Sequence, residues 1–129
     1  MPSYKNSVTL EKRIEESNRQ KNKNPTYVPV IVECEDTLAP VLKKRKYLIP
    51  RDITIAQFLF VLRREMKGLD PSVATFLFLE QNLVPAGEYV GKIYDDALEK
   101  RGVTTENQAK SDLFLYVYLA GENCFGKNL

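Results

Sequence analysis

Apolar residues along the chain fall into two kinds of pattern, continuous runs and helical spacing. Four runs rich in β-branched and aromatic residues predict strands: 27–34, 46–50, 75–80 and 113–119. Apolar residues spaced by three or four positions predict helices over 54–67 and 88–100. The segment 101–112 has few apolar residues, so we expect a flexible loop there.

The helix predicted over 54–67 carries the clearest local signals. Thr54 and Gln57 have the spacing of a capping box, and Gly68 supplies a stop at the other end. The segment 6–24 is polar, with Leu10 and Ile14 one helical turn apart. It is expected to form a helix on the surface.

This order of elements predicts one α+β domain. A hairpin, a long capped helix and returning strands are typical of a β-grasp fold, in which a four-stranded mixed sheet wraps the helix. The run 113–119 is almost wholly apolar and is therefore expected to form the central strand. The polar helix at the start is extra to this fold.

The residue types argue against an enzyme. The 129 residues include no histidine, the commonest general base and metal ligand, and no other catalytic constellation is evident. Cys34 and Cys124 are ninety positions apart and lack metal-ligand spacing. Cys34 is expected to be a small core residue and Cys124 an exposed thiol. We therefore expect no catalytic residue, no metal and no cofactor.

Charge is distributed unevenly around a net of +2. Residues 1–68 hold 14 basic and 8 acidic side chains, and residues 69–129 hold 5 and 9. The basic run 43–46 lacks the aromatic platform typical of nucleic-acid binding, so we expect no nucleic-acid partner. No signal peptide or membrane span is predicted, and the cysteine pattern favours a reducing, cytoplasmic compartment.

Several short blocks, in order, resemble a known family. They are Leu10-Glu11-Lys12-Arg13, residues 28–33, 46–50, 54–58 and 113–117, and the closing Gly-Glu-Asn-Cys-Phe-Gly that ends at Gly126. Together they are similar to the ubiquitin-like modifiers of autophagy, the autophagy-related protein 8 family. That family includes microtubule-associated light chain 3 and the GABA-A-receptor-associated proteins.

The resemblance implies a division of the chain and a fate for its end. Residues 1–24 would be an N-terminal helical extension with two short helices, 25–121 the ubiquitin-like domain, 122–126 a conjugation tail and 127–129 a removable propeptide. A cysteine protease would cleave the Gly126–Lys127 bond beside Phe125. Activating and conjugating enzymes would then join Gly126 to phosphatidylethanolamine, so the protein is their substrate. It would move from the cytoplasm to the autophagosomal membrane, with delivery to the vacuole or lysosome as a further expectation.

The resemblance also implies a site for cargo receptors that carry a W/F/Y-x-x-L/I/V peptide. The peptide would add to the edge of strand 46–50, beside two pockets. The first pocket is expected to involve Glu16, Pro29, Ile31, Lys46, Leu48 and Phe114. The second is expected to involve Tyr47, Ile49, Pro50, Ile53, Phe58 and Val61. Lys44 and Lys46 would meet acidic residues that flank the peptide motif.

Two residues of the first expected pocket have a second interpretation from the sequence. Ile31 and Phe114 fit core packing as well as pocket lining. Three residues depart from the family pattern: Tyr27 replaces a frequent arginine, Gln20 an apolar residue and Glu65 a basic residue. The alternative function is a ubiquitin-like adaptor that binds peptides without being conjugated.

Overall fold

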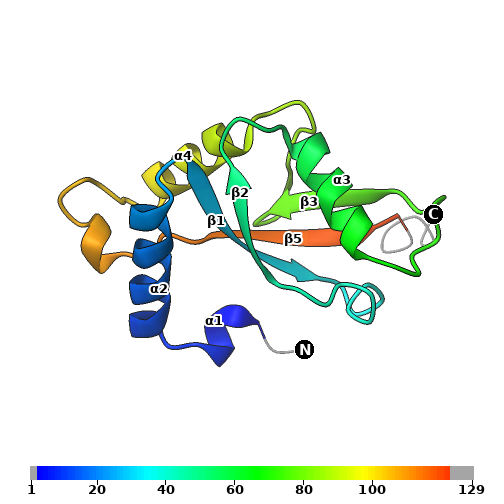
Figure 1. The fold of residues 1–129 in the computed structure, drawn as a ribbon, viewed down its shortest axis with the longest axis horizontal. Helices are drawn as coiled ribbons and strands as arrows, with labels where there is room; N and C mark the ends of the chain where they lie inside the picture. The colour runs from blue at the N-terminus through cyan, green and yellow to red at the C-terminus, as the bar shows by residue number, and fades with distance from the viewer. Residues whose placement is uncertain (1–2, 123–129) are drawn as a thin grey trace.

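The structure is a computed structural model that describes residues 3–122 (Figure 1). Its helices are α1 (Tyr4–Ser7), α2 (Leu10–Lys23), α3 (Ile55–Glu65), α4 (Val90–Lys100) and the short 3-10 helix η1 (Gln108–Lys110). Its strands are β1 (Tyr27–Cys34), β2 (Lys46–Pro50), β3 (Thr75–Leu79), β4 (Asn82–Leu83) and β5 (Leu115–Gly121). The expected α+β arrangement is confirmed, with N-terminal helices before a mixed sheet.

The five strands form one sheet in the order β2-β1-β5-β3-β4. The pair β1 and β5 is parallel, and the other neighbours are antiparallel. The apolar strand β5 is central, as its composition predicts. In Figure 1 the arrows of β1 and β5 point toward the same end of the sheet, where the described chain ends.

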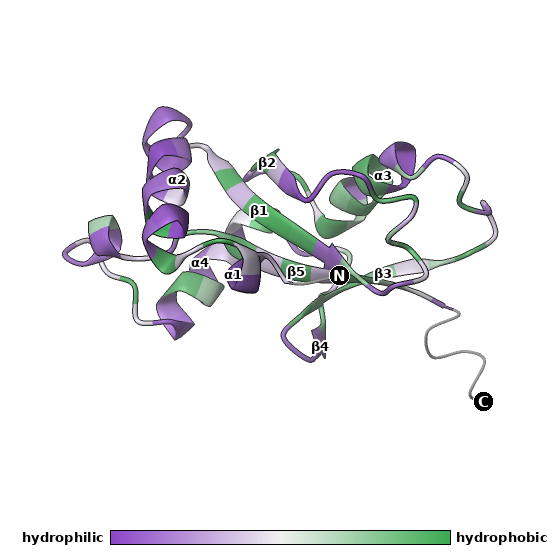
Figure 2. Ribbon diagram, turned by 90° about the horizontal axis from the view of Figure 1, so that it is seen from below, coloured by the Kyte–Doolittle hydropathy of each residue, from purple (hydrophilic) through white to green (hydrophobic). Residues whose placement is uncertain are grey.

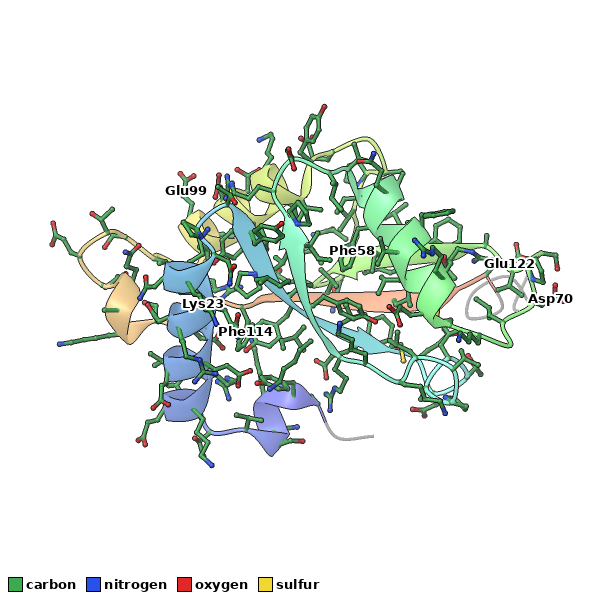
Figure 3. All side chains as sticks on the ribbon, viewed as in Figure 1. Lys23, Phe58, Asp70, Glu99, Phe114 and Glu122 are labelled. Carbon is green, nitrogen blue, oxygen red and sulfur yellow. The ribbon has the colours of Figure 1, made fainter. Side chains whose placement is uncertain are left out.

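Helix α3 forms where its capping signals lie. The Thr54 side chain accepts a hydrogen bond from the Gln57 N–H at 3.2 Å, and Gln57 Oε1 accepts one from the Thr54 N–H at 2.8 Å. Three residues on one face, Ile55, Phe58 and Leu62, are buried against the sheet. The labelled Phe58 in Figure 3 points from α3 into this core.

Strand β1 is mostly apolar because both of its faces are covered along most of its length. Val28, Val30 and Val32 belong to the main core cluster beneath α3 and α4. Ile31 points to the opposite face, where it packs with Phe114 and with Tyr4 of α1. Figure 2 shows the contrast between the apolar β1 and β5 and the polar surface of α2. Cys34 is half-buried and packs against the main cluster, as expected, whereas Cys124 lies outside the described residues.

The structure corrects several details of the prediction. The sheet has a fifth strand, β4, whose two residues are too few to leave a pattern in the sequence. The segment 101–112, expected to be a flexible loop, contains η1. Helix α3 ends at Glu65, with Met66 as its C-cap, and α4 begins at Val90.

A further correction is the start of β5, at Leu115 rather than 113. The Leu113 N–H donates to Ser17 Oγ at 2.9 Å, and the Leu113 carbonyl accepts from the Tyr94 hydroxyl at 2.7 Å. These side chains of α2 and α4 take the backbone groups that a strand neighbour would otherwise pair. Residues 113–114 therefore join α2 to the sheet.

Candidate peptide-docking edge

Strand β2 lies at one edge of the sheet and pairs only with β1 among the described strands. Hydrogen bonds from the Val32 N–H to the Arg45 carbonyl and from the Arg51 N–H to the Thr26 carbonyl fix the alternation of this antiparallel pair. It follows that the backbone groups of Lys46 and Leu48 point away from β1. These are the groups that an added strand would meet.

A cavity of about 210 Å³ lies beside this edge. Its lining comes from α2, from β1, from the start of β2 with the residue two positions before it, and from the segment before β5. The lining residues are Glu16, Gln20, Pro29, Lys44, Lys46, Tyr47, Leu48 and Phe114. The sheet register explains part of this grouping, because Pro29 lies opposite Leu48 and Ile31 opposite Lys46, on one face. Five of the six residues predicted for the first pocket therefore lie together.

Ile31 is the exception. Its side chain is fully buried beneath Tyr4 and Phe114, so it does not line the cavity. Phe114 is also almost fully buried, yet it forms part of the cavity wall. In Figure 3 the labelled Phe114 lies between α2, α1 and the sheet. Ile31 is therefore a core residue, whereas Phe114 both packs in the core and lines the cavity.

An ion pair stands at the rim of the cavity. Lys46 Nζ lies 2.7 Å from Glu16 Oε1, with side chains 51% and 23% exposed. The hydrogen bond to Glu16 raises the pKa of the Lys46 ammonium, which stays charged. Gln20, a departure from the family pattern, adds an amide to the same wall. The cavity therefore combines polar groups at its rim with apolar side chains in its wall.

Tyr4 supports this wall and was not predicted. Its ring meets Phe114 edge to face with centroids 5.7 Å apart, and Lys46 Nζ lies 5.5 Å from its centroid. The Tyr4 N–H donates to Glu33 Oε2 at 2.9 Å, which fixes α1 on β1. The four residues of α1 are too few for a hydrophobic period, so the only signal was an isolated aromatic residue in a polar segment.

The residues predicted for the second pocket divide into core and surface. Phe58 and Ile49 are buried in the main cluster, and Phe58 is only 1% exposed. This corrects the expectation that Phe58 lines an open pocket, because α3 turns its ring toward the sheet. Tyr47 is also buried and packs edge to face on Phe58, with centroids 6.0 Å apart. The half-buried members are Pro50, Ile53 and Val61.

Two other expected features can be placed. The Lys44 ammonium is exposed and lies 4.8 Å from the centroid of the Tyr47 ring, at the same edge of the sheet. Its positive charge therefore lies beside the open edge of β2. Phe125, Gly126 and the bond to Lys127 lie outside the described residues.

The Tyr47 hydroxyl leads to a prediction about alkaline stability. It is buried and has no hydrogen-bond partner among residues 3–122. Burial, and then the charge of Glu65, raise the pKa of this phenol from 10.0 to about 12. Because the pKa of Tyr47 is higher in the folded protein, the neutral phenol leaves stability unaffected below pH 10, and its ionisation destabilises the fold as the pH rises toward 12. At a pH of about 11.5, wild type should therefore lose about 2 kcal/mol of unfolding free energy through this group. Tyr47→Phe should not show that loss.

The measurement is urea unfolding of wild type and variant at pH 7 and at this alkaline pH. At pH 7 we expect Tyr47→Phe to be as stable as wild type or up to about 1 kcal/mol more stable, because a buried group without a partner is removed. Tyr27→Phe, at an exposed ring, is the matched control. Equal losses at alkaline pH in wild type and Tyr47→Phe would contradict the prediction.

A larger cavity, of about 330 Å³, lies elsewhere on the molecule. Its walls come from α4 and from the β3–β4 hairpin, with Lys5 and Tyr116 at one side. None of the predicted peptide-binding residues lines it. This cavity differs from the smaller one in that it does not lie beside the open β2 edge.

Two further observations bear on the kind of protein. Within residues 3–122, no helix combines the length and apolar character needed to cross a bilayer. In the same part of the chain, no three cysteine, aspartate or glutamate side chains gather where they could hold a metal ion.

Known proteins that are similar to this chain belong to one family. The family model described as "Autophagy protein Atg8 ubiquitin like" matches residues 12–126. The chain is 37% identical over 124 residues to autophagy-related protein 8e of Arabidopsis thaliana, covering 95% of this chain and 92% of the relative. It is 36% identical over 126 residues to autophagy-related protein 8 of Mycosarcoma maydis, covering 97% of each.

Two solved structures are similar in fold. The structure of Trypanosoma brucei ATG8 matches with a TM-score of 0.73 and 26% identity, covering 95% of this chain and 96% of that one. Plasmodium falciparum Atg8, solved in complex with a Plasmodium falciparum Atg3 peptide, matches with a TM-score of 0.68 and 21% identity. The second match covers 92% of this chain and 95% of that one.

Proposed function

The chain belongs to the Atg8 family of ubiquitin-like autophagy proteins, and from this we propose that it is a lipid-conjugated modifier that docks short peptides. In this proposal it is cleaved after Gly126 by a cysteine protease. Activating and conjugating enzymes then join Gly126 to phosphatidylethanolamine on the autophagosomal membrane. There its β2 edge recruits cargo receptors and autophagy factors.

The observation that carries the peptide-docking part is the open β2 edge with a cavity of about 210 Å³ beside it. An extended peptide can pair with the outward groups of Lys46 and Leu48 while its aromatic side chain enters the cavity. A peptide complex is known for one relative, since Plasmodium falciparum Atg8 was solved with an Atg3 peptide. That precedent supports peptide binding as the mode of recognition.

The second, aliphatic side chain of the motif would lie over Pro50, Ile53 and Val61, which are half-buried and apolar. Two buried side chains contribute about 1.5–3 kcal/mol each before ordering costs are subtracted. Micromolar affinity, about −8 kcal/mol, is the expected result. Many copies on one membrane would turn this modest affinity into firm attachment through avidity.

The lipid part of the proposal rests on the end of the sequence. The family match extends to residue 126, which is a glycine, and glycine's lack of a Cβ lets its carbonyl enter a narrow active site. Phosphatidylethanolamine carries two acyl chains, and two chains anchor a protein stably where one does so only marginally. One bond would therefore convert the protein to a membrane-bound form.

The test is intact mass spectrometry of the full chain after incubation with its family's processing protease. We expect a product that lacks Lys127-Asn128-Leu129, and then a lipid adduct once the conjugating enzymes and phosphatidylethanolamine vesicles are added. Retention of the three residues by wild type, or a normal adduct from Gly126→Ala, would overturn the conjugation proposal. Peptide binding that persists without any adduct would instead identify a non-conjugated adaptor.

A further inference from the structure

Helix α2 is attached to the rest of the domain mainly by polar contacts. Among residues 10–23, all of which the structure describes, only Ser17 is buried. None of the side chains in the two core clusters belongs to this helix. A helix that puts no apolar face into the core takes its orientation from hydrogen bonds and ion pairs instead.

One ion pair of α2 is largely shielded from water. Arg13 Nε lies 3.0 Å from Asp112 Oδ2, and 12% of each side chain is exposed. Through Nη1 the same guanidinium donates to the carbonyls of Val8 at 2.7 Å and of Lys5 at 3.0 Å. Arg13 therefore connects α1, the start of α2 and the segment before β5. These contacts use separate nitrogens of one planar group, an arrangement that a lysine ammonium does not reproduce.

Asp112 is the other half of this connection. Its Oδ1 accepts from the Phe114 N–H at 2.9 Å, and its Oδ2 accepts from the Tyr116 hydroxyl as well as from Arg13. Burial, and then the hydrogen bond to Asp112, raise the pKa of the Tyr116 hydroxyl, which stays protonated and donates. The Asp112 carbonyl accepts from Arg101 Nη1 at 2.8 Å. One carboxylate thus fixes α2 relative to Phe114.

This connection joins two walls of the cavity beside β2. Glu16 and Gln20 follow Arg13 by three and seven positions, so they lie on the same face of α2. Both line the cavity, and Phe114 lines it from the segment before β5. In Figure 3 the labelled Phe114 lies beside α2. The spacing of these two walls is therefore set by the pair of Arg13 and Asp112 rather than by apolar packing of α2.

We propose that Arg13 is a positioning residue for peptide docking. Through its pair with Asp112 it holds α2 against Phe114, and it thereby sets how tightly the cavity takes an aromatic side chain. The inference rests on the docking part of the function proposed above. Arg13 needs no contact with the peptide, because its guanidinium is engaged by Asp112 and by two backbone carbonyls.

The aliphatic position of the peptide motif is independent of this connection. It would lie over Pro50, Ile53 and Val61, which belong to β2, to the turn after it and to α3. The Ile53 carbonyl accepts from the Val90 N–H at 2.9 Å, so this part of the edge is held by the start of α4. A loss of Arg13 should therefore affect one side chain of the peptide and not the other.

The test is NMR titration of wild type and Arg13→Gln with three peptides that share acidic flanks: W-x-x-L, A-x-x-L and W-x-x-A. The aromatic ratio is the Kd of A-x-x-L divided by that of W-x-x-L, and the aliphatic ratio is the Kd of W-x-x-A divided by that of W-x-x-L. In wild type we expect each ratio to be about tenfold or more. In Arg13→Gln the aromatic ratio should fall about threefold or more, while the aliphatic ratio stays at its wild-type value.

Two further variants separate positioning from folding. Arg19→Gln, the same change at an exposed residue of α2, is the matched control and should keep both ratios. If thermal unfolding shows that Arg13→Gln does not fold, Arg13→Lys decides, because it keeps the charge beside Asp112 and loses the fork of donors. Its aromatic ratio should also fall, by a smaller factor. A loss of global stability alone would weaken all three peptides equally and leave both ratios unchanged.

Three results would overturn the inference. An unchanged aromatic ratio in the folded Arg13 variant would overturn it alone and leave peptide docking intact. Equal falls of both ratios would also overturn it and assign Arg13 to the stability of the whole docking edge. Failure of wild type to bind W-x-x-L would overturn the docking function, and this inference with it.

Discussion

Leu48→Pro is expected to weaken peptide docking strongly while the protein stays folded. The Leu48 N–H points away from β1, so a proline there removes a donor that only an added strand would use. Proline is tolerated in an edge strand when its missing N–H faces solvent. Its ring also obstructs the approach of a second strand. We expect binding about tenfold weaker than that of Leu48→Ala, which keeps the N–H and loses the side chain.

The measurement is calorimetric titration with a synthetic W-x-x-L peptide that carries acidic flanks. Ile49→Pro is the informative contrast, because the Ile49 N–H faces Val28 in the paired ladder and the side chain is buried in the core. That variant should unfold, whereas Leu48→Pro should show a thermal transition close to that of wild type. Equal affinities for Leu48→Pro and Leu48→Ala would remove strand addition from the proposed mechanism.

Phe58→Ala is expected to lower the unfolding free energy by about 3–5 kcal/mol. The ring is 1% exposed and packs on Tyr47 in the main cluster, so its removal leaves a cavity between α3 and the sheet. Domains of this kind have total stabilities of about 5–15 kcal/mol, and a loss of this size is a large share of that. Urea unfolding at pH 7 measures it directly.

Phe60 on the same helix is the matched control, since its ring is 63% exposed. Phe60→Ala should change the unfolding free energy by less than about 1 kcal/mol. A Phe58→Ala protein as stable as wild type, with weaker peptide binding, would return Phe58 to the second pocket where the family resemblance placed it.

The features that follow from neighbouring residues were predictable from the sequence. The capping box of Thr54 and Gln57 acts over one helical turn, and helix α3 begins where those residues place it. The apolar run that contains Leu115 to Leu119 marked the central strand, because a strand covered on both faces along most of its length is apolar at most positions. Features that do not depend on neighbouring residues were not predicted, because they leave no local pattern in the sequence. Strand β4 has two residues, and Leu113 pairs with Ser17 across 96 positions of sequence.

By itself, then, the sequence determined the order of the main elements, the family and the residues from which an edge site would be built, because period, caps and motif blocks are local properties. Only the tertiary structure decided which of those residues face the cavity and which are buried in the core. The register of β1 and β2 turned Pro29 and Leu48 toward the cavity, and packing beneath Tyr4 and α3 withdrew Ile31 and Phe58 from the surface. Register and burial depend on contacts between residues far apart in the chain, and no local pattern encodes them.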